Sequence, residues 1–262
     1  MTGAPVPVLM YHEVSPSPHP AFRRYTVTPW DFTRQMRWLA AFGYRTIDLD
    51  TLVRARLGRG SLPKRPVVIT FDDGFQGCAD HAVPVLRAHG FTAAFYLVTG
   101  LVGGTSRWLL PELGMELSLM SWETVRALAA EGFQCGAHTV THPRLPGLDP
   151  ARRHAELVDA RRRLEDELGR SIVHLAYPYG SFDPDVRAAA ADAGYVSACS
   201  TRPGLSGADE DLLAIRRITI YGHDTLMDFA CRLRTGAALR ERLRQALGGV
   251  AQRLRHQPGS RG

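Results

Sequence analysis

Short hydrophobic runs alternate with longer amphipathic segments along most of the chain. The short runs have the length of buried β-strands, whereas the amphipathic segments repeat their apolar residues every three to four positions, as helices do. We predict strands over Val6–Tyr11, Arg45–Ile47, Val67–Phe71, Ala93–Val98, Gln134–Ala137, Val173–Tyr177, Val196–Ser200 and Ile215–Ile220. We predict helices over Trp30–Phe42, Leu49–Ala55, Ala79–His89, Trp122–Glu131, Pro150–Leu168 and Pro184–Ala193.

This alternation predicts the fold class. A strand–helix order that continues along the chain produces a mostly parallel sheet with helices outside it, an α/β fold. Eight predicted strands favour a closed or nearly closed (β/α) barrel over an open sheet. No glycine-rich phosphate-binding loop follows any of these strands, which disfavours nucleotide-binding functions.

The composition is that of a folded globular protein, since 45% of the 262 residues are hydrophobic and 22% are charged. These fractions exclude a disordered, collagen-like or coiled-coil chain. The net charge of +6 is concentrated near one end, because residues 232–262 carry eight arginines and one acidic residue, Glu241. The remainder is close to neutral, so we expect no nucleic-acid partner. We therefore predict a barrel over residues 1–231 and a basic tail over residues 232–262.

The basic tail has two interpretations. Apolar residues recur in it near helical spacing, at Leu239, Leu243, Leu247, Val250 and Leu254. Such a helix either closes the barrel or makes a peripheral contact with an anionic membrane. No secretory signal is visible and no segment is apolar enough to span a membrane, so we expect a cytoplasmic protein, with the inner membrane face as the alternative. Nothing in the sequence bears on the oligomeric state.

Two adjacent carboxylates, Asp72 and Asp73, end the predicted strand over residues 67–71 and precede Gly74. The C-terminal end of a barrel strand projects side chains into the active-site mouth. Two carboxylates placed there repel each other unless a cation lies beside them. The alternative is an Asp-Gly turn with a capping aspartate.

Two histidines, His138 and His142, follow the predicted strand over residues 134–137. Imidazoles four residues apart can converge on one metal ion, although solvated loop histidines are the alternative. Together with the aspartates they offer three ligands and one spare carboxylate. That set is typical of a catalytic metal site in which a carboxylate acts as general base toward water.

An aromatic turn follows the predicted strand that begins near Val173. Its residues Tyr177, Pro178 and Tyr179 can form a wall against a sugar ring, or can simply pack on the core. We also predict that Trp108 and Phe182 stack on sugar faces, with the alternative that Trp108 closes its long loop onto the barrel.

The sequences TFDDG, HTVTHP and YPYG occur in this order, and the chain resembles the polysaccharide deacetylase family over roughly residues 6–222. This family is also called the NodB-homology domain or carbohydrate esterase family four. The resemblance implies a distorted (β/α)7-type barrel. It also implies metal-dependent hydrolysis of an N-acetyl, sometimes O-acetyl, group on a sugar, so residues 1–231 are expected to form the catalytic barrel.

The resemblance assigns roles to residues of this chain. Asp73, His138 and His142 correspond to the metal ligands, and Asp72 corresponds to the general base. Tyr179 corresponds to the residue whose backbone N–H binds the oxyanion. An Asp-His-His set suits Zn²⁺ best, with Co²⁺, Ni²⁺ and Fe²⁺ as chemically compatible alternatives.

The chain departs from the family pattern at two places. An arginine that often orients the base is replaced by Ala176, and Arg217 is one candidate for its role. The late Leu-x-His motif that supplies the general acid is absent, and His223 is a weak replacement. The opening Met-Tyr-His instead resembles the branch that includes poly-N-acetylglucosamine deacetylases. In that branch the barrel is circularly permuted and an early histidine, here His12, is the general acid.

The function predicted on this basis is N-deacetylation of an amino sugar, with release of acetate. Two alternatives stay open: hydrolysis of another carbon–nitrogen bond, in a cyclic amide or ureide, and non-catalytic carbohydrate binding. The sequence leaves the substrate open among a polymer, a lipid-linked sugar and a small glycoside. Without a visible signal peptide, we expect a cytoplasmic glycoside or a lipid-linked sugar.

Overall fold

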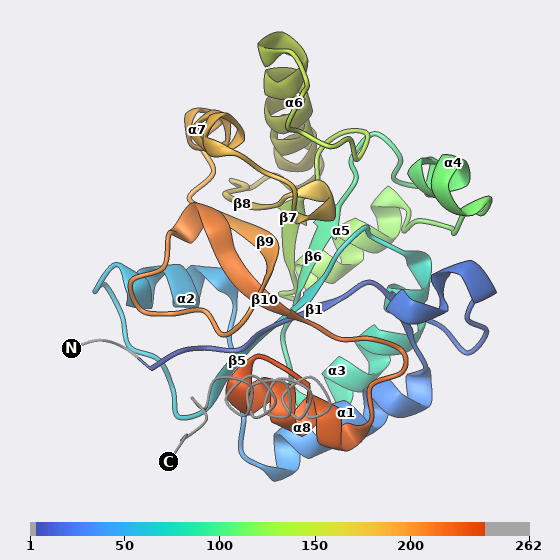
Figure 1. The fold of residues 1–262 in the computed structure, drawn as a ribbon, viewed down its shortest axis with the longest axis vertical. Helices are drawn as coiled ribbons and strands as arrows, with labels where there is room; N and C mark the ends of the chain where they lie inside the picture. Colours follow the sequence, from blue (N-terminus) through green and yellow to red (C-terminus); the bar gives the residue numbers. More distant parts are fainter. Residues whose placement is uncertain (1–3, 239–262) are drawn as a thin grey trace, which may run out of the picture.

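The computed structural model describes residues 4–238, and seven of its strands form a closed parallel barrel (Figure 1). The barrel closes because β1 pairs with β10 on one side and with β5 on the other. In their order around the barrel the strands are β1 (Val8–Tyr11), β5 (Pro66–Phe71), β6 (Ala94–Leu97), β7 (Gln134–Ala137), β8 (His174–Ala176), β9 (Ser197–Pro203) and β10 (Ile215–Thr219). The predicted (β/α)7-type barrel is confirmed.

Three short strands lie outside the barrel. β4 (Arg45–Thr46) pairs with the first two residues of β5, whereas β6 pairs with its last two. β2 (Glu13–Val14) and β3 (Thr26–Val27) form a separate parallel pair beyond the end of β1. The hydrophobic pattern did not predict β2 or β3, because two-residue strands are shorter than the windows in which periodicity is visible.

Helices surround the barrel (Figure 1). They are α1 (Pro29–Ala41), α2 (Leu49–Arg56), α3 (Val83–His89), α4 (Leu110–Leu113), α5 (Trp122–Ala130), α6 (Pro150–Leu168), α7 (Pro184–Asp192) and α8 (Leu226–Thr235). Shorter turns are η1 (Pro20–Tyr25), η2 (Cys78–Ala82), η3 (Arg107–Leu109), η4 (Pro178–Gly180) and η5 (Leu212–Ala214). Several helices begin where a side chain caps them; the Asp183 carboxylate, for example, accepts from the Val186 N–H.

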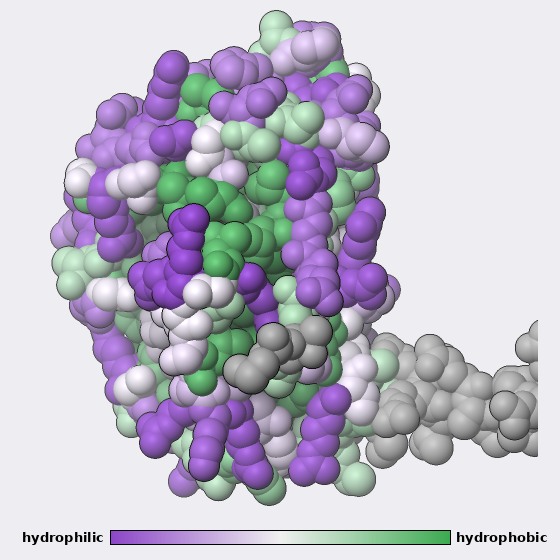
Figure 2. All heavy atoms as spheres, turned by 90° about the vertical axis from the view of Figure 1, so that its left-hand side faces the viewer, coloured by the Kyte–Doolittle hydropathy of each residue, from purple (hydrophilic) through white to green (hydrophobic). Residues whose placement is uncertain are grey.

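The helix layer is uneven around the barrel. η5 connects β9 to β10, so no α-helix separates these two strands in the described chain. Figure 2 shows the side of the molecule on which α2 lies, where hydrophilic side chains surround a central hydrophobic region. None of the described helices combines the length and the apolar character required to cross a membrane.

The predicted boundary between barrel and tail, at residue 231, falls inside α8. Arg232, the first residue assigned to the tail, is buried and pairs with Asp224, with 3.1 Å between Nε and Oδ2. Residues 239–262, which carry the rest of the predicted tail, lie outside the described residues. The two-part division and the membrane contact therefore stay predictions, as does the circular permutation.

Candidate active site

A cleft of about 560 Å³ opens at the C-terminal ends of the barrel strands. This is the end at which barrels of this type place their reactive side chains. The cleft is lined by Met10, His12, Phe22, Tyr25, Asp72, Asp73, Trp108, Leu109, Glu112, Leu113, His138, His142, Arg144, Tyr179, Thr201, Thr219 and Tyr221.

Asp73, His138 and His142 meet at the bottom of this cleft. The Asp73 Oδ1 atom lies 3.4 Å from His138 Nε2 and 3.2 Å from His142 Nε2, and all three side chains are buried. Within the described residues this is the one group of acidic, histidine or cysteine side chains whose ligand atoms are close enough to share a metal ion. The predicted ligand set is therefore brought together.

The backbone around these residues is strained. Asp73, Thr139 and His142 have φ values of 75°, 65° and 63°, in the left-handed region that non-glycine residues seldom adopt. Each such residue costs on the order of 1–3 kcal/mol, and such strain persists where the surroundings determine the conformation. Here the Thr139 hydroxyl accepts a hydrogen bond from the His142 N–H at 3.1 Å, which fixes the loop between the two histidines.

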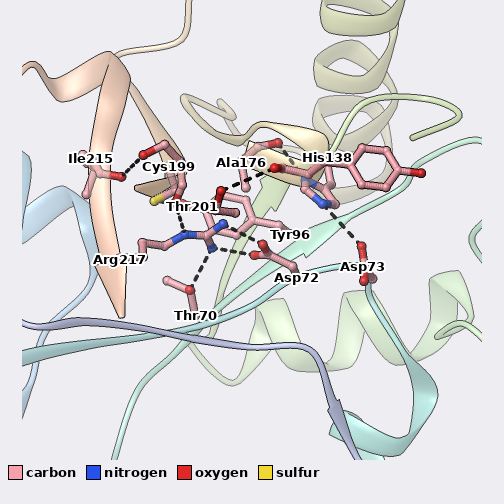
Figure 3. Close-up of polar contacts among 12 residues, drawn as sticks. Thr70, Asp72, Asp73, Tyr96, His138, Ala176, Cys199, Thr201, Ile215 and Arg217 are labelled. Carbon is pink, nitrogen blue, oxygen red and sulfur yellow. Dashed lines mark hydrogen bonds and ion pairs between the residues drawn. The ribbon is translucent and has the colours of Figure 1, made fainter. Parts of the chain in front are cut away.

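The orientation of the imidazoles fits a bound cation. His138 Nδ1 lies 2.7 Å from the Ala176 carbonyl, which can only accept, so Nδ1 carries a proton and Nε2 is the nitrogen that faces Asp73 (Figure 3). Both ring nitrogens of His142 are buried; Nδ1 has no partner, and Nε2 faces Asp73 Oδ1 at 3.2 Å in a geometry that does not form a hydrogen bond. Burial opposes ionisation of Asp73, but its contacts with the two imidazoles hold the pKa of its carboxyl well below the usual range. A metal ion would satisfy the unpartnered His142 nitrogen and this carboxylate together.

Asp72 points to the other side, toward Arg217 on β10 (Figure 3). The two side chains form a bidentate pair, with 2.6 Å between Nη1 and Oδ1 and between Nη2 and Oδ2. Burial opposes ionisation of Asp72, but the charge and hydrogen bonds of Arg217 hold the pKa of this carboxyl below its ordinary value. The cation predicted to replace the missing arginine at Ala176 is thus Arg217, on a different strand.

Hydrogen bonds hold Arg217 itself in place inside the barrel. Its Nε donates to the Ser200 carbonyl at 2.9 Å, and its Nη1 also donates to the Thr70 hydroxyl at 3.1 Å. The side chain is fully buried. The orientation of Asp72 therefore depends on residues from β5, β9 and β10.

Residues 59–198 match the sequence model of the family described as polysaccharide deacetylase. The chain belongs to the polysaccharide deacetylase family. It is 25% identical to YxkH of Bacillus subtilis over 217 residues, or 83% of this chain and 72% of YxkH. It is 33% identical over 132 residues to a chitooligosaccharide deacetylase of Bradyrhizobium, covering 50% of this chain and 53% of that protein. The solved structure of the Streptococcus pyogenes deacetylase PplD in complex with acetate has a TM-score of 0.77 and 25% identity, covering 88% of this chain and 98% of PplD.

In this polysaccharide deacetylase, His12 stands at the end of β1 and lines the cleft. Its ring packs against Tyr25, with 5.1 Å between the centroids, and its Nδ1 is buried without a hydrogen-bond partner. Burial lowers the pKa of His12, and the nearby Asp73 and Asp72 oppose that effect. His223, the weaker candidate, stacks on Tyr221 and is not among the residues that line the cleft.

The predicted aromatic wall needs a correction. Tyr179 and Trp108 line the cleft, and Trp108 stacks on His142 with 4.6 Å between the ring centroids. Tyr177, Pro178 and Phe182 do not line it. Pro178 and Tyr177 are buried; Tyr177 also donates to the Leu213 carbonyl at 2.9 Å and stacks on Phe182 at 4.8 Å. These three residues are part of the packing behind the turn, which for Tyr177 and Pro178 was the alternative interpretation of the motif.

One residue that was not predicted from the sequence fixes the loop between His138 and His142. Glu156 on α6 is buried, and its Oε2 accepts hydrogen bonds from the N–H groups of Val140 and Thr141 at 2.8 and 2.9 Å. Because these two residues lie between His138 and His142, Glu156 fixes the separation of the two ligands. The signal available in the sequence is that this acidic residue shares its helix face with apolar residues such as Leu157 and Ala160.

Proposed function

We propose that this protein is a metal-dependent N-deacetylase that hydrolyses the N-acetyl group of amino sugars in a glycan. The observation that carries the proposal is the placement of Asp72 beside the Asp73, His138 and His142 group in one cleft, with Asp72 held ionised by Arg217. A carboxylate that is kept charged and close to a metal-ligand set is suited to act as a general base toward water. Membership of the deacetylase family supports the same reaction.

The proposed cofactor is a divalent cation held by Asp73, His138 and His142. Zn²⁺ fits this donor set best, and Co²⁺, Ni²⁺ and Fe²⁺ are the alternatives. When bound, such an ion would polarise the acetyl carbonyl and acidify a water molecule.

Three residues of the chain would carry out the proton transfers and bind the oxyanion. Asp72 accepts a proton from the water as its oxygen bonds to the acetyl carbon. The backbone N–H of Tyr179 donates to the oxygen that gains negative charge. His12 donates a proton to the sugar nitrogen as the carbon–nitrogen bond breaks, which leaves a free amino sugar and acetate.

The proposed substrates are oligosaccharides or polymers of N-acetylglucosamine. The relative from Bradyrhizobium is a chitooligosaccharide deacetylase, and the cleft of this chain opens to solvent between aromatic side chains that include Trp108 and Tyr221. Aromatic faces and edges are suited to hold the apolar faces of sugar rings.

An acetate-release assay tests this function. The protein is stripped with a chelator, reloaded with Zn²⁺, Co²⁺, Ni²⁺ or Fe²⁺, and incubated with chitooligosaccharides and with a panel of cyclic amides and ureides. We expect acetate from the sugars only after reloading. Turnover of the ureides alone would favour the other hydrolase function, and no turnover with no bound metal would favour carbohydrate binding. The variant D72N serves as the inactive control.

A further inference from the structure

Four side chains form a column of ring contacts along one wall of the cleft. Trp108 stacks on the metal-ligand candidate His142 with 4.6 Å between centroids, and His142 packs on Tyr179 with the same separation. The guanidinium of Arg144 covers the Tyr179 ring, with its Cζ 4.0 Å from the centroid. The column therefore ends in the cationic side chain of Arg144, which has no role in the proposed reaction.

Arg144 also contacts a second side chain that lines the cleft. Its Nη2 lies 3.8 Å from the Glu112 carboxylate of α4, and both side chains are more than half exposed. An exposed ion pair at this distance is weakened by solvent. The stacking on Tyr179, at 4.0 Å, is therefore the stronger of the two contacts that Arg144 makes.

The turn that carries Tyr179 needs support on both of its sides. Tyr179 has a φ of 59°, and Gly180 follows it with a φ of 64°. On the backbone side, Thr201 packs so closely that a Cβ at Gly180 would lie 2.1 Å from its hydroxyl oxygen. The Thr201 hydroxyl also donates to the Tyr179 carbonyl over a long 3.4 Å (Figure 3). On the ring side, the support consists of His142 and Arg144.

We propose that Arg144 is a positioning residue that holds the Tyr179 turn, and with it the backbone N–H that faces the developing oxyanion. The proposal rests on the proposed deacetylase function. Its physical basis is that the ring of Tyr179 contacts both His142 and Arg144, so removal of the Arg144 contact leaves a strained turn with less support. A displacement of about 1 Å at such a site can cost about 10²-fold in rate.

The test compares R144A with R163A. Arg163 is a matched control because it is exposed to the same extent, lies 5.4 Å over the Trp122 ring and pairs with Glu167 at 3.1 Å, but belongs to α6 and does not line the cleft. Steady-state kinetics on chitotriose give kcat and KM for each variant. Affinity for a methylphosphonamidate analogue of the acetamide, measured by calorimetry on the metal-loaded protein, reports the oxyanion site without turnover.

We expect R144A to lower kcat by about 10- to 100-fold with little change in KM, and to weaken the phosphonamidate by a similar factor. R144K, which keeps the charge but lacks the flat guanidinium, should recover part of the loss, and R163A should match the wild type. A wild-type kcat in R144A, or a loss confined to KM, would overturn the proposal and make Arg144 a substrate contact or a bystander. Absence of acetate release by the wild type would instead count against the deacetylase function.

Discussion

Arg217 and Asp72 form a bidentate ion pair in the interior of the barrel, with both nitrogen–oxygen distances at 2.6 Å. The pair joins β10, the last strand of the described chain, to the residue that follows β5. A buried pair of this kind repays its desolvation only when the remaining donors are also satisfied, and here Thr70 and Ser200 accept from Arg217. The pair thus links the protonation state of the proposed base to the closure of the barrel.

Arg217→Met should destabilise the protein strongly. It leaves the Asp72 carboxylate buried without its counter-charge, a change that typically costs about 3–5 kcal/mol. The double variant D72N/R217M removes both charges and should recover much of that stability while staying inactive. Urea denaturation of the two single variants and the double variant checks this expectation. Equal stability of R217M and wild type would show that the pair contributes nothing to the fold.

Asp72→Asn should lower turnover by about 10²- to 10⁴-fold, the usual contribution of a general base. The variant leaves Arg217 without a carboxylate partner, so some loss of stability is expected as well. Kinetics must therefore be measured on protein whose circular dichroism and metal content match the wild type. Turnover within a few-fold of the wild type would remove Asp72 from the base role.

His12→Ala should affect amide and ester substrates differently. An amine departs only when it is protonated, whereas 4-nitrophenolate departs readily as an anion. We expect a loss of about 10²-fold or more on N-acetyl sugars and a much smaller loss on 4-nitrophenyl acetate. The ratio of the two kcat/KM values is the decisive measurement. If both substrates lose the same factor, His12 is not the proton donor to the leaving group.

Glu13 should make the stability of the fold pH-dependent. Its buried carboxyl, on β2, has an unpartnered Oε1, and burial raises its pKa from 4.5 to about 8. Between these values the native state keeps a proton that the unfolded chain has lost, so stability falls as the pH rises through this window. The slope is at most about 1.4 kcal/mol per pH unit. Glu13→Gln should abolish this slope. The stability of the variant relative to the wild type should therefore be higher at pH 7.5 than at pH 5.

Urea denaturation of E13Q and wild type at both pH values, in the presence of a chelator, tests this point. The chelator removes the separate pH dependence of metal binding. Parallel pH profiles for the two proteins would mean that Glu13 is ionised in the native state.

Metal loading should raise the melting temperature. Binding to the native state alone adds about 2.7 kcal/mol of stability at a metal concentration 100 times the Kd. Thermal melts of chelator-treated protein with and without added Zn²⁺ measure the shift, and Asp73→Ala should abolish it. A shift of the same size in D73A would place the bound ion elsewhere.

Much of the site was predictable because its chemistry is local in sequence. Asp72 and Asp73 follow one strand, and His138 and His142 follow another, so the strand pattern alone places them at one end of the barrel. The interpretation of Tyr177 was wrong because a strand pattern does not tell which of two nearby aromatic residues faces the cleft. Glu156 was missed because its function depends on the fold of a distant loop around its carboxylate.

The pairing of β1 with both β5 and β10 has a consequence for biosynthesis. His12 comes before Arg217 in the sequence, so β1 is synthesised before β10. Until then the nascent protein carries an unpaired Asp72 and an open barrel edge beside β1. Premature termination before residue 215 would therefore yield an inactive product whose exposed strand edges favour aggregation and proteolysis. The barrel can therefore close only after synthesis has passed β10.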